Sequence, residues 1–267
     1  MKRPSPRTRN FIAAFIGITP FVLGGYAACI EPRWLEVTEH SIELPVAAPL
    51  TIAHVSDLHL RRIGAVETAT LDAVAAAHPD LIVVTGDLFD RAPAKTSAAE
   101  FLSRLQAPLG VWYVPGNWEH WVDPEAQTPG IATTSAGLLI NRAAEVRGDL
   151  WIVGLDDALA GTPRPDEALS NVPVGVATLA LFHSPAFFSR IADRIDLGLA
   201  GHMHGGQIRV PFVGAIVTPS GSGPYVHGWY REGRASLYVS RGIGMTILPL
   251  RFACRPELAI IRVNPKM

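Results

Sequence analysis

Two histidines separated by one residue, in Gly201-His202-Met203-His204-Gly205, could bring two imidazoles into one small volume. Side chains two apart on an extended backbone point to the same side, and flanking glycines let a loop turn sharply. Imidazoles are common ligands of transition metals, so this spacing indicates metal binding. A His-x-His pair alone is a weak signal, and the alternative is one surface histidine beside one buried histidine.

Four further sites along the chain carry carboxylate, amide or imidazole groups of the same kind. Asp57 and His59 are two apart, Asp87 and Asn117 each follow a glycine, and His183 ends an apolar run. Any one of them could be an ordinary turn, since Gly-Asp and Gly-Asn are common in turns. Their repetition after successive apolar runs is much harder to explain by turns.

Short apolar strands and intervening helices must position these side chains. The predicted strands of the first half are Leu50–Val55, Leu81–Val84 and Val111–Val114, and the predicted helices are Val66–Ala77 and Thr96–Leu105. A β-α-β order predicts parallel strands with right-handed crossovers. The carboxyl ends of such strands meet at one sheet edge, where open α/β sheets carry their sites. Asp57, Asp87 and Asn117 would therefore emerge together.

The rest of the chain is predicted to be mainly β. Its predicted strands are Trp34–Leu44, Leu150–Leu155, Ala177–Phe182, Ile195–Ala200, Ile208–Val217, Ser236–Ser240 and Leu258–Val263. The acidic pair Asp156-Asp157 could contact the site, but a solvated loop is favoured. Two packed sheets with helices outside them fit this order, which predicts an α/β fold.

Composition narrows the classes of function. With 267 residues, 48% of them hydrophobic and 18% charged, the chain is long and apolar enough for one large domain, and disorder is disfavoured. Residues 1–10 hold four basic residues and no acidic one, which leaves 19 basic and 24 acidic residues elsewhere. No nucleic-acid-binding surface is therefore expected. With only two cysteines, Cys29 and Cys254, the sequence disfavours a disulfide framework and excludes a cysteine-based metal site.

The run Phe11–Ile30 contains no charged residue and follows the basic decapeptide. Twenty helical residues span about 30 Å, enough for a bilayer core. We predict that residues 1–32 form an uncleaved membrane anchor and residues 33–267 a domain on the extracytoplasmic side, because basic residues favour the cytoplasmic end. The alternatives are a signal peptide cleaved near Ala27-Ala28, which would release a secreted protein, and lipid attachment at Cys29.

Taken in order, the polar motifs resemble those of the calcineurin-like metallophosphoesterases. They are Asp57-x-His59, Gly86-Asp87-x-x-Asp90, Gly116-Asn117, His183 and Gly201-His202-x-His204, within residues 50–207. The segments Arg241–Gly244 and Leu248–Glu257 resemble the membrane- or wall-associated phosphodiesterases of bacteria. The resemblance implies a four-layer α/β/β/α sandwich of two mixed sheets, which agrees with the predicted order of elements.

The resemblance also implies two adjacent divalent cations, Mn²⁺, Fe or Zn²⁺. One would be held by Asp57, His59, Asp87 and His204, and the other by Asp87, Asn117, His183 and His202. The shared Asp87 would bridge them, and Asp90 would orient a ligand or a loop without touching a metal. Such a pair binds phosphate oxygens and lowers the pKa of a bridging water, which then attacks phosphorus in line with the leaving group.

One position departs from the family pattern. Many members have a histidine after Gly-Asn that assists the transition state or the leaving group, and here that residue is Trp118. Indole supplies no proton near neutral pH. Either His120 takes over this role, or the leaving group is a weak base, such as a phosphate or nucleotide, that needs no proton. The family's bacterial UDP-diacylglucosamine pyrophosphohydrolases likewise lack that histidine and have arginine there.

The sequence therefore predicts a metal-dependent hydrolase of phosphodiesters or phosphoanhydrides, with a substrate that could be lipid-linked. The alternative is a non-catalytic metal- or phosphate-binding module on a membrane anchor, supported only by Trp118. Every position of the ligand pattern holds a residue type that can bind a metal, which favours the enzyme. An α/β hydrolase with a serine nucleophile is disfavoured because the chain lacks a Gly-x-Ser-x-Gly elbow.

Overall fold

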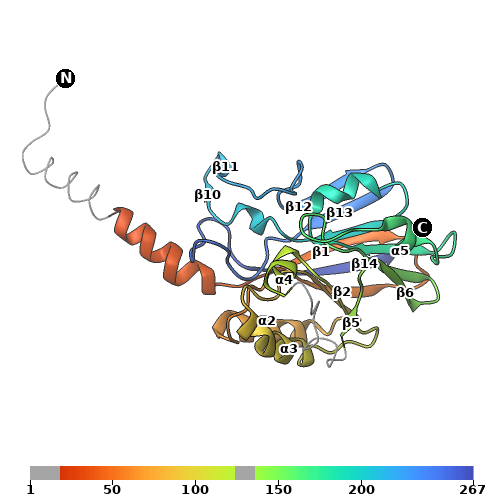
Figure 1. Ribbon diagram of the computed structural model, residues 1–267, viewed down its shortest axis with the longest axis horizontal. Coiled ribbons are helices and arrows are strands. Elements are labelled where there is room, and N and C mark those ends of the chain that lie inside the picture. Colours follow the sequence, from red (N-terminus) through yellow and green to blue (C-terminus); the bar gives the residue numbers. More distant parts are fainter. Residues whose placement is uncertain (1–18, 124–135, 267) are drawn as a thin grey trace, which may run out of the picture.

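Two six-stranded β-sheets form the centre of the fold, with helices on their outer sides (Figure 1). The computed structural model describes residues 19–123 and 136–266. A separate two-stranded hairpin, β10 (Arg209–Val210) with β11 (Gly214–Ala215), projects beside the second sheet.

The first sheet has the strand order β1-β14-β2-β3-β4-β5. Its strands are β1 (Glu36–Leu44), β2 (Leu50–Val55), β3 (Leu81–Thr85), β4 (Val111–Val114), β5 (Gly137–Leu138) and β14 (Glu257–Pro265). β2, β3 and β4 are parallel neighbours, with His54 opposite Val83 and Val83 opposite Trp112. β14 runs antiparallel to β2, so the sheet is mixed. The carboxyl ends of β2, β3 and β4 consequently lie at one edge.

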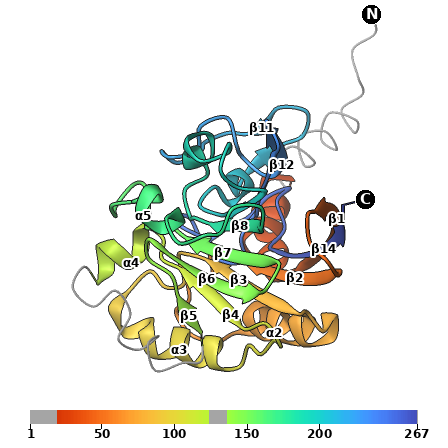
Figure 2. The same cartoon turned by 90° about the vertical axis from the view of Figure 1, so that its right-hand side faces the viewer.

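The second sheet has the strand order β12-β13-β9-β8-β7-β6. Its strands are β6 (Arg142–Arg147), β7 (Leu150–Gly154), β8 (Ala177–Leu181), β9 (Leu197–Ala200), β12 (Gly228–Glu232) and β13 (Ala235–Val239). The four inner strands are parallel, whereas β6 and β12 pair antiparallel at the two edges. This sheet is therefore mixed as well, and Figure 2 shows its strands β6, β7 and β8.

The helices are short and lie between the strands in the chain. They are α2 (Ala65–Ala77), α3 (Lys95–Ser103), α4 (Asn117–Val122), α5 (Pro165–Leu169) and the 3₁₀ turns η3 (Ala92–Ala94), η4 (Pro185–Arg190) and η5 (His204–Gly206). The Glu67 carboxylate accepts a hydrogen bond from Gly64 N–H at 2.9 Å and caps the start of α2. The helix ends at His78, because the following Pro79 disfavours a further helical turn.

Three apolar clusters hold the layers together. One lies between the sheets, with Ile52 from the first and Leu179 from the second. Another joins the first sheet to α2 and α3 through Val74 and Phe101, and a third joins the second sheet to α5 and η4, where Phe188 is buried. β3 is covered on both faces by these clusters, so its sequence is a continuous run of apolar residues.

The predicted α/β fold with two mixed sheets is confirmed, and the helices form its outer layers. The predicted strand Ile208–Val217 is wrong in extent, since only β10 and β11 pair. Pro211 donates no backbone hydrogen bond and Phe212 has a left-handed φ of 68°, so the extended run breaks into a hairpin.

Residues 19–25 are helical and continue as the π-helical turn η1 (Tyr26–Ile30) and the 3₁₀ turn η2 (Glu31–Arg33). In residues 19–123 and 136–266, no helix has both the length and the apolar character needed to cross a membrane. The predicted anchor Phe11–Ile30 lies partly outside these described ranges. Glu31 is buried, and its carboxylate accepts hydrogen bonds from the N–H groups of Ala253 and Cys254.

Candidate metal centre

The loops that follow β2 and β3 carry the first polar side chains in a strained backbone. Asp57, His59 and Asp87 have φ values of 52°, 43° and 52°, in the left-handed region that residues other than glycine rarely adopt. Such strain persists only where the surroundings fix it, and it clusters at functional sites. At Gly86 a Cβ would lie 2.6 Å from Gly116 N, so only glycine lets the β3 and β4 loops approach this closely.

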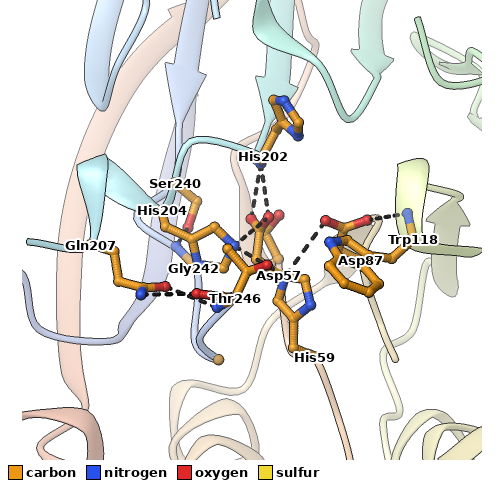
Figure 3. Close-up of polar contacts among 12 residues, drawn as sticks. Asp57, His59, Asp87, Trp118, His202, His204, Gln207, Ser240, Gly242 and Thr246 are labelled. Atoms are coloured by element: carbon orange, nitrogen blue, oxygen red, sulfur yellow. Dashed lines mark hydrogen bonds and ion pairs between the residues drawn. The ribbon is translucent and has the colours of Figure 1, made fainter. Parts of the chain in front are cut away.

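Asp57, His59 and His204 form one group of potential metal ligands, all of them buried. His59 Nε2 lies 3.1 Å from His204 Nε2, and His204 Nε2 lies 3.5 Å from Asp57 Oδ1 (Figure 3). The Asp57 carboxylate also accepts the backbone N–H of His202 at 2.9 Å, which ties the His-x-His loop to the end of β2. Residues 145 apart in the sequence thus meet across the two sheets.

Asp87, His183 and His202 form the second group, which is also buried. His183 Nε2 lies 3.2 Å from Asp87 Oδ2 and 3.1 Å from His202 Nδ1. The outer ring nitrogens face backbone carbonyls: His183 Nδ1 donates to Thr85 O at 2.8 Å and His202 Nε2 donates to Ser220 O at 2.5 Å. These bonds fix both rings with their inner nitrogens 3.1 Å apart, an orientation that metal-binding histidines share.

One oxygen atom connects the two groups. Asp87 Oδ2 is 3.2 Å from His183 Nε2 and 3.5 Å from His59 Nε2, which belong to different groups. The other oxygen, Asp87 Oδ1, accepts the backbone N–H of Trp118 at 3.0 Å, which fixes the carboxylate (Figure 3). Asn117 is buried beside Trp118, and its Oδ1 has no hydrogen-bond partner within residues 19–123 and 136–266. A buried amide oxygen without a partner is costly unless a cation binds it.

Burial sets the protonation of the imidazoles. It lowers the pKa of His59 to about 4 and holds the pKa values of His202 and His204 below their ordinary range. These three rings are neutral near pH 7 and can act as ligands. Burial alone would also lower the pKa of His183, but the adjacent Asp87 carboxylate outweighs it and raises that pKa well above its usual value.

The pKa values of the two aspartates shift in opposite directions. Burial raises the pKa of Asp57 to about 6, because a charged form is poorly solvated there. For Asp87 burial acts the same way, yet the neighbouring His183 and His59 outweigh it and lower the pKa. A buried anion so placed attracts positive charge, and His183 supplies it as a proton when no cation is bound.

Glu119 on α4 supports the centre and was not predicted from the sequence. Its buried carboxylate accepts backbone N–H groups from Gly116 at 2.7 Å, Asp87 at 3.0 Å and Leu88 at 2.5 Å. Burial raises its pKa to about 7. The sequence signal was a glutamate three residues after Gly116, the usual position for a residue that caps a helix start.

Arg251 is the second unpredicted support, although it lies in a segment that carried the family resemblance. It is fully buried, and its guanidinium donates to the carbonyl oxygens of Gly242 at 3.0 Å, Gly244 at 2.6 Å and Cys254 at 3.1 Å. Its Nη2 also lies 3.4 Å from His204 Nδ1. Arg251 thereby fixes the loop that packs behind His204.

The remaining predicted residues lie around these groups. His120 Nε2 contacts Asp156 Oδ1 at 2.7 Å, so its ring is held by that carboxylate. Asp90 accepts hydrogen bonds from Arg61 at 3.2 Å and Arg91 at 3.0 Å and so joins the loop after His59 to the loop after Asp87. The Trp118 ring lies edge-on to His59, with centroids 5.6 Å apart.

The prediction that Asp156-Asp157 lies in a solvated loop is wrong. Asp157 is fully buried and accepts the Ser184 hydroxyl at 2.8 Å and the N–H groups of Leu159 and Ala160. Asp156 accepts the Thr162 N–H as well as His120. In this tight turn the two carboxylates accept backbone N–H groups that no backbone carbonyl accepts in the described part of the chain. From the sequence alone, a buried aspartate of this kind looks the same as a solvated one.

The two His/Asp groups fit a binuclear divalent metal site. Carboxylate oxygen and imidazole nitrogen are suitable ligands for first-row transition metals, and ligand type alone does not select one of them. The shared Asp87 oxygen meets the need of two close cations for a common anionic ligand. These candidate ligands follow the carboxyl ends of β2, β3, β8 and β9, and Asn117 follows the end of β4.

Comparison with known proteins agrees with this geometry. Residues 50–206 match the family model of the calcineurin-like phosphoesterases. The chain is 32% identical to "Uncharacterized metallophosphoesterase YkuE" of Bacillus subtilis, over 90% of this chain and 89% of that protein. It is 33% identical to "Phosphodiesterase YaeI" of Escherichia coli, over 90% of this chain and 92% of that protein.

Among solved structures, the fold resembles the NAD nucleotidase NadN of Haemophilus influenzae, with a TM-score of 0.50 and 13% identity. The match covers 73% of this chain and 51% of that one, so this chain corresponds to about half of the larger structure. At this identity the likeness concerns the fold alone. The family match and the full-length relatives show that the chain belongs to the calcineurin-like phosphoesterases and is a metal-dependent phosphoric ester hydrolase.

Proposed function

We propose that the protein hydrolyses phosphodiesters or phosphoanhydrides at a pair of divalent cations, Mn²⁺, Fe or Zn²⁺. The observation that carries this proposal is the position of Asp87 Oδ2, within 3.5 Å of an imidazole nitrogen from each group. Asp57, His59 and His204 would hold one cation, and Asn117, His183 and His202 the other, with Asp87 between them. The unpartnered Asn117 oxygen supports its assignment as a ligand.

The chain's own residues prepare the site for this reaction. Bound cations supply Lewis acidity, which lowers the pKa of water and neutralises charge on phosphoryl oxygens. His183 and His202 donate their outer N–H groups to backbone carbonyls, which directs their inner nitrogens toward the centre. A bound cation would take the place of the proton that His183 otherwise carries beside Asp87. Glu119 and the Trp118 N–H hold Asp87 in place from both sides, so little reorganisation is needed when substrate binds.

The leaving group defines the substrate class. The side chain after Asn117 is an indole, which supplies no proton, and the His120 ring is held by Asp156. A departing phosphate or nucleotide is a weak base and gains little from protonation. This favours a phosphoanhydride or an activated diester, such as a lipid-linked pyrophosphate of the UDP-diacylglucosamine type.

We further propose that residues 11–30 anchor the protein in the bacterial inner membrane, with the domain on the extracytoplasmic side. The uncharged run and the basic residues before it support this orientation. Secretion after cleavage is the competing arrangement. A reporter active only outside the cytoplasm, fused after Met267, is expected to be active, and membrane fractionation separates the anchored form from the secreted one.

Hydrolysis of bis(4-nitrophenyl) phosphate tests the reaction itself. We expect activity with Mn²⁺, loss of activity with chelator, and loss of at least about 10³-fold in Asp87→Ala, because removing the shared ligand disrupts both sites. The control Asp72→Ala changes an exposed carboxylate on α2 and should keep wild-type rates. Metal binding without hydrolysis of any phosphoester would instead favour the non-catalytic module, which the indole at position 118 supports.

A further inference from the structure

An exposed apolar edge lies next to the metal centre. It consists of Phe212, Val213, Ile216 and Val217 from the β10–β11 hairpin, and of Ile247 and Leu248 from the loop after β13. Phe212 and Ile247 are 110% and 92% exposed, which is unusual for large apolar side chains in water. Apolar exposure of this kind marks a surface that contacts another apolar phase.

A groove runs under this apolar edge toward the metal centre. Its volume is about 280 Å³, and its walls are mainly apolar, with Met203, Ile216, Val217 and Leu248 among them. His204, a member of the first group of potential metal ligands, also lines the groove. A chain of methylene groups in this groove would therefore end beside the cations.

Gln207 keeps the groove open in a defined shape. Its side chain accepts the Thr246 N–H at 2.9 Å and donates to Thr246 O at 3.1 Å and Leu248 O at 2.9 Å (Figure 3). These bonds join the turn that follows His204 to the loop that bears Ile247. The groove is thus built from two segments that are tied together and does not depend on a single loose loop.

The segments that build the groove carry basic residues but no acidic ones. Residues 201–231 and 241–256, which build the hairpin and the loop, contain no Asp or Glu, although the chain has 24 such residues. Residues 1–30 contain none either. An apolar surface without acidic residues, with Arg209 and Arg255 nearby in the chain, suits a membrane whose lipid headgroups are anionic.

The N-terminal apolar segment leaves the domain at this same edge (Figure 1). The Tyr26 ring packs edge-on against Phe252, with centroids 6.4 Å apart, and Arg251 N–H donates to Ala27 O at 2.9 Å. Just before these contacts, Phe21 and Val22 are 82% and 61% exposed. The segment proposed as the anchor and the apolar edge would therefore face the same lipid layer.

From these observations we propose that the groove binds an acyl chain of a membrane lipid whose phosphate group is presented to the metal centre. This inference rests on the proposed function and names the class of its substrate: a lipid phosphoester or lipid-linked anhydride. The occupant is an acyl chain because the groove is apolar, has His204 in its lining, and lies near the segment expected to enter the bilayer.

Burial of each methylene tightens binding about fourfold, so affinity for a phosphate ligand should rise with chain length until the groove is full. The probes are butyl phosphate and octyl phosphate, titrated by calorimetry into the full-length protein in lipid nanodiscs with Mn²⁺, with empty nanodiscs subtracted. We expect wild type to bind octyl phosphate at least about tenfold more tightly than butyl phosphate.

Two variants test whether the difference in affinity between octyl and butyl phosphate arises in the groove. Ile216→Asp places a charge in the groove wall at a side chain that is 60% exposed, so folding should be unaffected, and the gap between the two ligands should fall below about threefold. Val174→Asp changes an exposed valine that does not line the groove and should keep the gap. Equal affinity of wild type for the two ligands, or an unchanged gap in Ile216→Asp, would overturn the proposal.

Hydrolysis of bis(4-nitrophenyl) phosphate, which has no acyl chain, separates this inference from the proposed function. We expect equal rates in wild type and in the control Val174→Asp. Hydrolysis without any chain-length effect would contradict the groove assignment and leave the hydrolase intact. A chain-length effect without hydrolysis would support the groove and contradict the proposed reaction.

Discussion

The carboxylate of Glu119 accepts the backbone N–H of Asp87 at 3.0 Å, so a side chain on α4 sets the position of the residue shared by both groups of potential ligands. The same carboxylate accepts Gly116 N–H and Leu88 N–H. The β3 and β4 loops are thus joined by one buried group. A carboxylate has the acceptor capacity for all three donors, whereas an amide has a single oxygen.

Glu119→Gln should therefore lower the rate of bis(4-nitrophenyl) phosphate hydrolysis about 10- to 100-fold, as loss of an outer support of a metal site typically does. The variant should also lose Mn²⁺ affinity, measured by calorimetry. Glu100→Gln, an exposed glutamate on α3, is the matched control and should match wild type. Full activity and unchanged Mn²⁺ affinity in Glu119→Gln would show that this carboxylate does not position the centre.

His120 was a sequence candidate for proton transfer, and its contact with Asp156 predicts a structural role. We expect His120→Gln to retain activity within about fivefold of wild type, far from the 10²- to 10⁴-fold contribution of a general acid. The rate should be measured with UDP-glucose and with bis(4-nitrophenyl) phosphate. A loss above about 10²-fold on either substrate, with the fold intact, would restore His120 as the proton donor.

The same pair predicts a pH dependence of stability. The hydrogen bond to Asp156 raises the pKa of His120, and despite burial the pKa of Asp156 is lowered. The stabilisation is complete between about pH 4 and 6.5, where unfolded histidine and aspartate are also charged. It is lost as the pH rises through the raised pKa of folded His120, or falls through the lowered pKa of folded Asp156.

A double-mutant cycle of His120→Gln and Asp156→Asn, followed by urea unfolding, measures the stabilisation that this pair contributes. We expect a coupling free energy of about 1–2 kcal/mol at pH 6, which declines toward pH 9. A coupling that is equal at the two pH values would mean that the pair is not ionic in the folded protein.

Trp118 is predicted to restrict the substrate to good leaving groups. Trp118→His should raise kcat/KM for glycerol 3-phosphate about 10- to 100-fold relative to UDP-glucose, because a proton donor helps an alkoxide to leave. Trp121→His changes the neighbouring exposed indole, 5.6 Å away between ring centroids, and should leave the ratio unchanged. If wild type already prefers glycerol 3-phosphate, the assigned substrate class is wrong.

Arg251 is expected to contribute mainly to the free energy of unfolding. Arg251→Lys replaces a planar group that donates to several buried carbonyl oxygens by one that reaches fewer of them. Unfolding in urea should show a loss of about 2–3 kcal/mol, because buried acceptors lose their donors. Arg262→Lys, at an exposed ion pair with Glu39, should lose less than about 0.5 kcal/mol. Equal losses would contradict the role given to Arg251.

Local hydrophobic pattern and the order of the elements along the chain were enough to predict part of the fold. The strands before Asp57, Asp87 and Asn117 are apolar runs buried on both faces, and their β-α-β order required a common edge. The pairing of His59 with His204 was inferred from the family resemblance, since no local pattern relates loops on different sheets.

Residues that act through backbone contacts were the ones missed. Glu119 and Arg251 each satisfy groups from distant segments, and Asp157 is buried because it replaces backbone partners in a turn. Hydrophobic periodicity carries no information about such contacts, because a buried charge and a solvated charge look the same in sequence. The apolar run Ile208–Val217 predicts a single strand, but the structure forms the hairpin β10–β11, and most of its apolar residues are exposed.

The central claim is that two cations share Asp87, and the metal content of the purified protein tests it most directly. After Mn²⁺ loading and desalting, elemental analysis of wild type and of the control Asp72→Asn should give about two metal ions per chain, the number expected of a two-metal site. Asp87→Asn should hold one ion or fewer, with hydrolysis abolished. Two ions retained in Asp87→Asn, or at most one in active wild type, would contradict the shared-aspartate centre.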